Sequence, residues 1–326
     1  MQKSNYEKRE DIFNLYANNL RIYLEKLGGV VRIDGVNIDL TKSPIYVCPL
    51  CRRMYAKSNI EGKDPVLTRE HNPPKAIGGD ARVLTCKTCN KFFGHSTDQT
   101  LINDVIDEPF YDKEPNASID ATFNIQGHNV PGKIIPSQNL LLLELDGLKK
   151  SKQAQIKKYI TKPGPGHADI TVRKNDFREA NRSALKIAYL EMFAVFGYAF
   201  VFHENAARLR DAMKNPNSPY PICRVNDKVD ENLLGMSIIK EPTNLVNYKI
   251  VVPFKFYGGR QRNTAIIIPG PSEKHWQNYV EWSKQRDQIS FTATVYPKYQ
   301  GVITNPECVF DYYGFMGEPV ERPVNY

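Results

Sequence analysis

The sequence predicts an α+β protein in which a small, zinc-pinned strand–strand–helix module lies between an N-terminal helix and a larger C-terminal α+β region. Two observations carry this prediction. Apolar residues recur at helical spacing in some segments and alternate in others. Four of the six cysteines form two C-x-x-C pairs, and these mark the module. We divide the chain into residues 1–45, 46–105 and 106–326.

The composition is that of an ordinary globular protein with a mild basic excess. Hydrophobic residues are 41% and charged residues 25% of the chain, which excludes wholesale disorder. The net charge of +8 favours a polyanionic partner. The charged start, MQKSNYEKREDIF, lacks the apolar core of a secretory signal, and charged residues interrupt the longest apolar stretch, residues 185–202. We therefore expect a cytoplasmic protein without a membrane span.

Residues 5–27 have the pattern of an amphipathic helix. Apolar residues such as Tyr16 and Leu20 repeat at the spacing of one helical face. Gly28 should end the helix, because glycine tolerates a left-handed cap. The alternating stretch that follows, residues 30–40, predicts a hairpin.

The two C-x-x-C pairs are formed by Cys48, Cys51, Cys86 and Cys89. A two-residue spacing lets two thiolates bind one ion from a tight turn, and two such turns complete a tetrahedral Cys₄ zinc site. A site with four protein ligands is closed, so we expect this zinc to be structural. Any catalytic residues should then lie between the pairs or just after the second pair.

The residues between the pairs predict a strand, a loop and a second strand, with a helix after them. The first strand covers residues 66–71 and stops at Pro73 and Pro74, because proline cannot donate to a strand ladder. The second strand covers residues 82–85, and the helix covers residues 87–104.

This segment resembles a known family. The string Glu70-His71-x-Pro-Pro-x-x-x-Gly-Gly, followed by Leu-x-Cys86-x-x-Cys89-Asn90, is similar to the motif of the zinc-bearing subgroup of HNH (His-Asn-His, ββα-metal) endonucleases. The stretch RSALKIAYLEMFAVFGYAF also resembles a segment that follows such modules in larger chains. The resemblance implies a metal-dependent endonuclease that hydrolyses phosphodiester bonds of nucleic acid, in restriction or anti-phage defence. DNA is favoured over RNA as the substrate, and the sequence leaves the choice between them open.

The resemblance also implies roles for individual residues. His71 corresponds to the general base that activates water, a role that neutral imidazole suits at neutral pH. Glu70 and Asn90 correspond to the ligands of a catalytic Mg²⁺ or Mn²⁺. Glu70 and His71 can serve one site only if the strand bends there. The family's middle Asn is absent, since Ala81 and Arg82 stand in its place.

On the predicted helix, Asn90 and Asp98 share a face, and we expect Asp98 to orient a metal ligand. His95 is rotated by ~140° from Asn90, so we interpret it as a solvated residue. Basic side chains of the module are expected to contact phosphates. They are Arg52, Arg53, Arg69, Lys75, Lys87 and Lys91. A lysine-rich stretch at 147–168 is open to two interpretations, a solvated helix face or a further phosphate-contacting patch.

The remaining chain is predicted to be α+β, and its role is open among target recognition, sensing and dimerisation. Strands are expected at 119–125, 139–147, 247–257, 263–270, 289–297 and 308–315, with helices after Asp176 and over 205–214. We expect nucleic acid as a partner, no membrane, and either a homodimer or a partner protein. The alternative hypothesis is a non-catalytic zinc-knuckle protein that binds nucleic acid or another protein.

Overall fold

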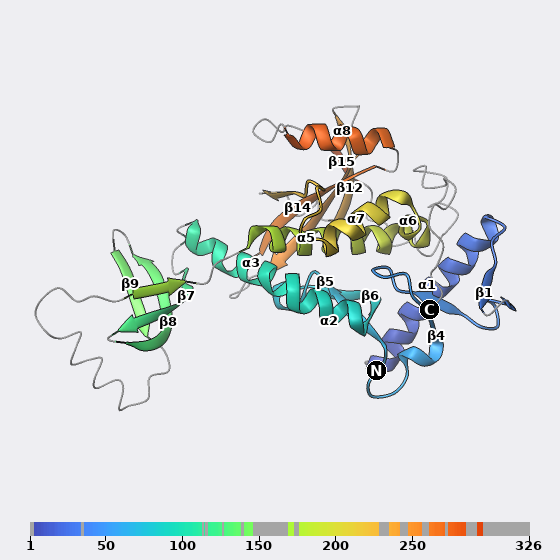
Figure 1. Cartoon of the computed structure of the whole chain (residues 1–326), viewed down its shortest axis with the longest axis horizontal. Coiled ribbons are helices and arrows are strands. Elements are labelled where there is room, and N and C mark those ends of the chain that lie inside the picture. The colour runs from blue at the N-terminus through green and yellow to red at the C-terminus, as the bar shows by residue number, and fades with distance from the viewer. Residues whose placement is uncertain are drawn as a thin grey trace, which may run out of the picture. The chain divides into compact units, whose positions relative to one another are not determined.

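The computed structural model combines helices with sheets whose described strand pairs are all antiparallel, which confirms the mixed α and β character of the chain (Figure 1). It describes residues 3–33, 36–112, 114, 117–125, 127–137, 140–145, 169–172, 176–227, 235–241, 247–255, 261–270, 273–284 and 292–295. Two compact units are present, one made of Met1–Leu101 with Arg178–Tyr326 and the other of Ile102–Phe177. These units cut across the predicted segments, because a helix after residue 176 packs against the predicted module.

The first unit begins with helix α1 (Asn5–Lys26). Ser4 caps it reciprocally with Glu7: the Glu7 amide donates to the Ser4 hydroxyl, and the Ser4 amide donates to the Glu7 carboxylate. The predicted apolar face is confirmed at Tyr16 and Leu20, which are buried. Gly28 follows in the left-handed region, as its position after the helix predicts. The predicted hairpin is formed by β1 (Val31–Ile33) and β2 (Val36–Ile38).

The predicted order of strand, loop, strand and helix is confirmed in the module. Its elements are β3 (Ile45–Val47), β4 (Met54–Ala56), η1 (Lys57–Ile60), β5 (Leu67–Asn72), η2 (Lys75–Ile77), β6 (Asp80–Cys86), α2 (Lys87–Phe93), η3 (Gly94–Asp98) and α3 (Gln99–Tyr111). The single helix predicted over 87–104 is instead interrupted by η3, a π-helical turn between α2 and α3. A π turn changes the rotation per residue, so side chains after it leave the face expected from α-helical spacing.

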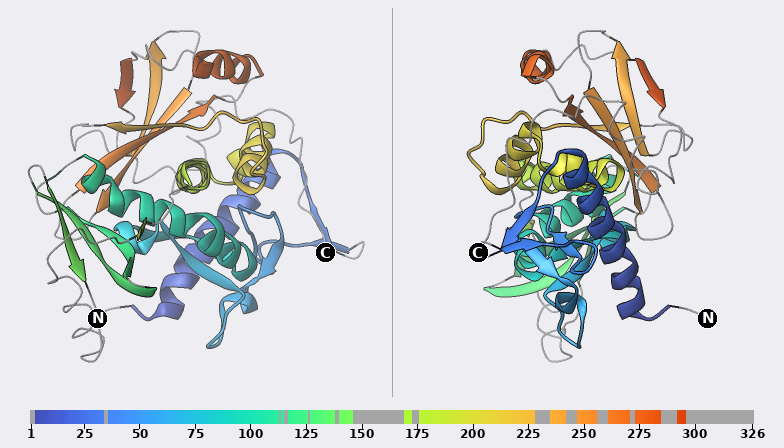
Figure 2. Two further views of the ribbon diagram at one scale, coloured as in Figure 1. Left: turned by 60° about the vertical axis from the view of Figure 1, so that its left-hand side comes forward. Right: turned by 90° about the vertical axis from the view of Figure 1, so that its right-hand side faces the viewer.

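The C-terminal part of the first unit is a helical layer followed by an antiparallel sheet. The helices are α5 (Phe177–Phe196), α6 (Tyr198–Val201), α7 (Glu204–Lys214) and α8 (Glu273–Lys284). The sheet has the order β11 (Cys223–Asp227), β14 (Gln261–Pro269), β13 (Asn247–Lys255), β12 (Gly235–Glu241) and β15 (Thr292–Val295). Helix α5 is apolar on most of its circumference and is buried accordingly. Figure 2 shows α5 end-on, between α2 and this sheet.

The second unit contains most of α3 and a four-stranded antiparallel sheet. The order of the sheet is β10 (Asp169–Val172), β7 (Ile119–Ile125), β8 (His128–Ser137) and β9 (Leu140–Leu145). Buried and exposed residues alternate along β7, as the sequence predicts, and Phe123 lies at the centre of its core. The predicted strand at 308–315 and the lysine-rich stretch at 147–168 lie outside the described residues. Among the helices that the structure describes, none combines the length and apolarity needed to cross a bilayer.

Candidate metal centre and active site

Four cysteine sulfurs form a compact cluster in the module. The Sγ atoms of Cys48, Cys51, Cys86 and Cys89 all lie within 4.8 Å of one another, and those of Cys51 and Cys86 are 3.7 Å apart. This spacing allows one metal ion to be held by all four thiolates. The predicted convergence of the two C-x-x-C pairs is therefore confirmed.

Backbone geometry holds the sulfurs in place. The Cys86 amide donates to Cys48 Sγ at 3.4 Å, and the Cys89 amide donates to Cys86 Sγ at 3.5 Å. Arg52 adopts a left-handed φ of 63° and closes the first turn by donating its amide to the Cys48 carbonyl at 2.8 Å. Burial raises the pKa of the Cys48 thiol, whereas hydrogen bonding to Cys48 lowers the pKa of Cys51 to about 7. The sulfurs thus interact as a single ligand set.

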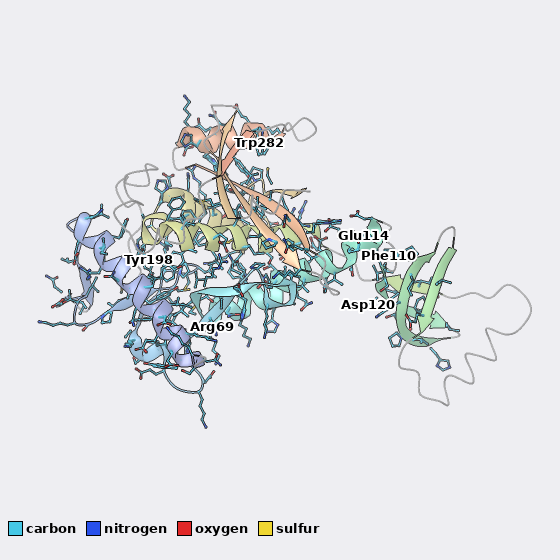
Figure 3. All side chains as sticks on the ribbon, turned by 180° about the vertical axis from the view of Figure 1, so that it is seen from behind. Arg69, Phe110, Glu114, Asp120, Tyr198 and Trp282 are labelled. Atoms are coloured by element: carbon cyan, nitrogen blue, oxygen red, sulfur yellow. The ribbon has the colours of Figure 1, made fainter. Side chains whose placement is uncertain are left out.

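Two buried tyrosines from the C-terminal helices fasten the first cysteine turn. Tyr198, labelled in Figure 3, accepts from the Val47 amide and donates to the Val47 carbonyl, both at 2.8 Å. Tyr189 of α5 donates to the Pro49 carbonyl at 2.8 Å. The metal centre is therefore supported by residues far away in the sequence as well as by its own turns.

The hairpin of β5 and β6 ends in a tightly packed loop. The two strands pair from Leu67 with Cys86 to Asn72 with Asp80, and a register shift leaves Arg82 opposite no residue. At Gly79, a Cβ atom would lie 1.5 Å from the Pro73 carbonyl oxygen, so only glycine fits there. The loop that follows β5 is thus held close to the strand end.

His71 lies near that end of β5 and is half-buried. No described residue makes a hydrogen bond to its imidazole. Burial lowers its pKa, and the positive charges of Arg69 and Lys75 lower it further, so the neutral imidazole is favoured. Neighbouring strand residues point to opposite faces, so His71 shares a face with Arg69 and not with Glu70.

Glu70 is only 5% exposed and faces α5. Its Oε1 accepts from Lys186 Nζ at 2.9 Å, and its Oε2 accepts from the Thr85 hydroxyl at 2.9 Å. Lys186 is fully buried and donates also to Asp98 Oδ2 at 2.6 Å. Burial alone would lower the pKa of Lys186, but the charges of Glu70 and Asp98 outweigh it and raise the pKa. The predicted metal ligand is therefore part of a buried ion cluster.

Asn90 and Asp98 also reach this side of the hairpin. The Asn90 amide nitrogen donates to the Thr68 hydroxyl at 3.1 Å, on the β5 face that carries Glu70. The Ser183 hydroxyl of α5 donates to Asp98 Oδ1 at 2.6 Å. Asp98 thus contacts Lys186 and Ser183, which hold it in place, and touches neither predicted metal ligand in the described hydrogen bonds. His95 is exposed, in line with its interpretation as a solvated residue.

The predicted Mg²⁺ ligands fit such an ion unequally. Mg²⁺ keeps several of its water molecules and requires exposed oxygen ligands. Asn90 is half-buried, and its amide oxygen is left available in the described hydrogen bonds, because only its nitrogen bonds to Thr68. Glu70 does not meet the requirement for an exposed oxygen, because it is buried and an ammonium group touches its carboxylate. Glu70, as placed, is therefore not available to a Mg²⁺ ion.

The predicted phosphate-contacting residues are distributed over the module surface. Arg53, Lys75, Lys87 and Lys91 are exposed, and Lys87 pairs with Asp64. Arg69, labelled in Figure 3, is partly buried; its Nη1 donates to Asn5 of α1, and its Nε is buried with no partner in the described chain. An unpaired buried donor beside His71 is unusual and marks this position as a candidate ligand contact.

Sequence reasoning missed the contribution of α5. Lys186 bonds to Glu70, and Glu191 accepts from the Asn72 side-chain amide at 2.9 Å, so α5 contacts both residues that flank His71. A signal for these contacts was present: Lys186 and Glu191 interrupt an otherwise apolar helix. A charged residue on a buried helix requires a partner of opposite charge.

Comparisons of the chain with protein-family models, with curated proteins and with solved structures return no match.

Proposed function

We propose that this chain is a nuclease of the HNH type, which hydrolyses phosphodiester bonds of nucleic acid with His71 as the general base. The observation that carries the proposal is the state of His71: a half-buried imidazole with no hydrogen-bond partner in the described chain, whose pKa is lowered by burial and by the positive charges of Arg69 and Lys75. It lies on the hairpin whose other end carries Cys86 of the Cys₄ cluster. The motif around it supports membership of the HNH family, and DNA is the favoured substrate.

Phosphodiester hydrolysis by this mechanism requires a general base and cations at one site. Neutral imidazole accepts a proton from water, and the resulting hydroxide attacks phosphorus while the 3′-oxygen leaves. The pentacoordinate transition state carries extra negative charge on its oxygens, which cations stabilise. The positive charges of Arg69 and Lys75 lower the pKa of His71, so both side chains are placed to stabilise negative charge that develops near it.

Zinc is the proposed ion of the Cys₄ cluster, where it would be structural, since four thiolates leave no open position for substrate. A requirement for Mg²⁺ or Mn²⁺ in catalysis stays a prediction. Asn90 would be its ligand, from the β5 face that carries Glu70 and not His71. Glu70 would be a second ligand only if Lys186 moved away from its carboxylate. The proposed roles of His71, Arg69 and Lys75 do not depend on that exchange.

A second candidate function has a specific observation in its favour. The burial of Glu70 in an ion cluster with Lys186 is typical of a structural residue. The chain would then be a zinc-knuckle protein that binds nucleic acid or a partner protein without cutting it.

Incubation of the purified protein with supercoiled plasmid, linear duplex, single-stranded DNA and RNA separates the two. Parallel reactions contain Mg²⁺, Mn²⁺ or EDTA, and products are resolved on gels. Cleavage of at least one nucleic acid supports the nuclease. Retention of these substrates in gel shifts, with no product under any metal condition, supports the non-catalytic alternative.

A further inference from the structure

The outer face of α2 combines positive charge with an exposed aromatic ring. The residues Lys87, Thr88, Lys91, Phe92, His95 and Ser96 line an open hollow on α2 and η3. We call it the α2 hollow. One of its lining residues, Phe92, is 45% exposed, whereas the next residue, Phe93, is fully buried. Of two adjacent phenylalanines, one therefore packs in the core and the other faces solvent.

Contacts within the chain partly orient the Phe92 ring. It meets the ring of Phe93 nearly edge-on, with centroids 5.0 Å apart and an interplanar angle of 86°. Because the ring is 45% exposed, part of its surface stays open to solvent, where a base can stack. Thr88 and Ser96 lie one turn before and about one turn after Phe92, so small polar residues flank the ring along the helix.

The lining of the hollow carries no acidic residue. Lys91 is exposed and has no ion-pair partner in the described part of the chain, whereas Lys87 is paired with Asp64. A cation next to an exposed aromatic face is the combination by which proteins bind single-stranded nucleic acid, since the cation contacts phosphate and a base stacks on the ring. An acidic peptide would satisfy Lys91 but would leave the Phe92 face without a flat partner.

We propose that the α2 hollow binds an unpaired stretch of nucleic acid, with a base stacked on Phe92 and a phosphate at Lys91. The biological role of this binding rests on the proposed function, because the inference assigns the nuclease a substrate with single-stranded character. The binding itself requires neither His71 nor cleavage.

Fluorescence anisotropy tests the inference with a labelled single strand of about 12 nucleotides, within the usual site sizes, and with a duplex of the same sequence. EDTA is present throughout to suppress cleavage. Phe92→Ala should weaken single-strand binding by about 5-fold or more, because the loss of one base stacked on an aromatic ring lowers the affinity by at least about that factor. Duplex binding should change much less. Phe92→Trp should retain the affinity, since a larger ring also stacks.

Two further variants make the test specific. Phe177→Ala is the matched control, because it removes another exposed phenylalanine, 66% exposed, that lies outside the hollow, and it should leave affinity unchanged. Lys91→Gln should reduce the slope of log affinity against log salt by about 0.7, the loss of one phosphate contact on a single strand.

The inference is overturned if Phe92→Ala binds the single strand as tightly as the native protein, or if the substitution weakens binding of the duplex and of the single strand equally. It is also overturned if polyglutamate, added at the same concentration of negative charges, displaces the oligonucleotide. Its failure is distinguishable from failure of the nuclease. Phe92-dependent binding without any cleavage upholds the inference and refutes the nuclease, whereas cleavage with Phe92-independent binding does the reverse.

Discussion

At the scale of single residues, the clearest feature is Lys186. Its ammonium group is fully buried and is shared by two carboxylates, Glu70 at 2.9 Å and Asp98 at 2.6 Å. A buried charge is tolerated only when it is paired, so each member of this cluster depends on the others. The cluster also explains why Glu70 points towards α5.

Lys186→Met should destabilise the protein by about 3–5 kcal/mol, because it leaves two buried carboxylates without a cation. Urea unfolding followed by circular dichroism measures the change. Lys214→Met, which alters an exposed lysine at the end of α7, is the control and should shift stability by less than about 0.5 kcal/mol.

A triple variant shows whether charge is the cause. Adding Glu70→Gln and Asp98→Asn to Lys186→Met removes the unpaired charges, so much of the lost stability should return. If the triple variant is no more stable than Lys186→Met alone, the loss comes from packing, and the charge explanation is wrong.

At the scale of elements, the local pattern predicted most of the module and missed what depends on distant residues. The strands around His71 were predictable from the prolines and glycines that separate them. The π turn η3 was not, since Asp98, its last residue, makes its contacts with Ser183 and Lys186, which lie more than eighty positions further along the chain. No local periodicity records such contacts.

The two cysteine turns are the element on which the module depends most. We expect about one equivalent of zinc in native protein, measured by elemental analysis, and far less in Cys86→Ser, because one of four ligands is lost. The variant should also lower the unfolding temperature, since metal binding in such segments contributes to folding.

Cys223→Ser is the matched control for this experiment. Cys223 is also buried, but it lies in β11 and is not part of the sulfur cluster. Its replacement should leave the zinc content unchanged. Native protein with less than about half an equivalent of zinc, or equal zinc in Cys86→Ser, would contradict the assignment.

At the scale of the whole molecule, α5 joins the parts of the first unit. It contributes Lys186 and Glu191 to the β5 side and Tyr189 to the first cysteine turn. The α+β character of the chain and the grouping of its cysteines were predictable from sequence. The dependence of the module on α5 was not, because composition and spacing describe neighbours along the chain and not partners across the fold.

The candidate site was predictable in part for the same reason. The motif located His71, and the structure adds a half-buried imidazole beside Arg69 and Lys75. The motif also paired Glu70 with Asn90 as metal ligands. In the structure, Glu70 and the hydrogen-bond partner of Asn90 lie on one face of β5. Glu70 also accepts a hydrogen bond from Lys186, a contact that only the folded chain brings about.

The most direct test of the account is the cleavage rate of His71→Ala on the substrate that the native protein cuts best. General-base catalysis contributes about 10²–10⁴-fold, so the rate should fall by that factor, while zinc content and nucleic-acid affinity stay near native values. His128→Ala, an exposed histidine on β8, should cut at the native rate. If His71→Ala cuts as fast as native protein, His71 is not the base and the proposed mechanism is wrong.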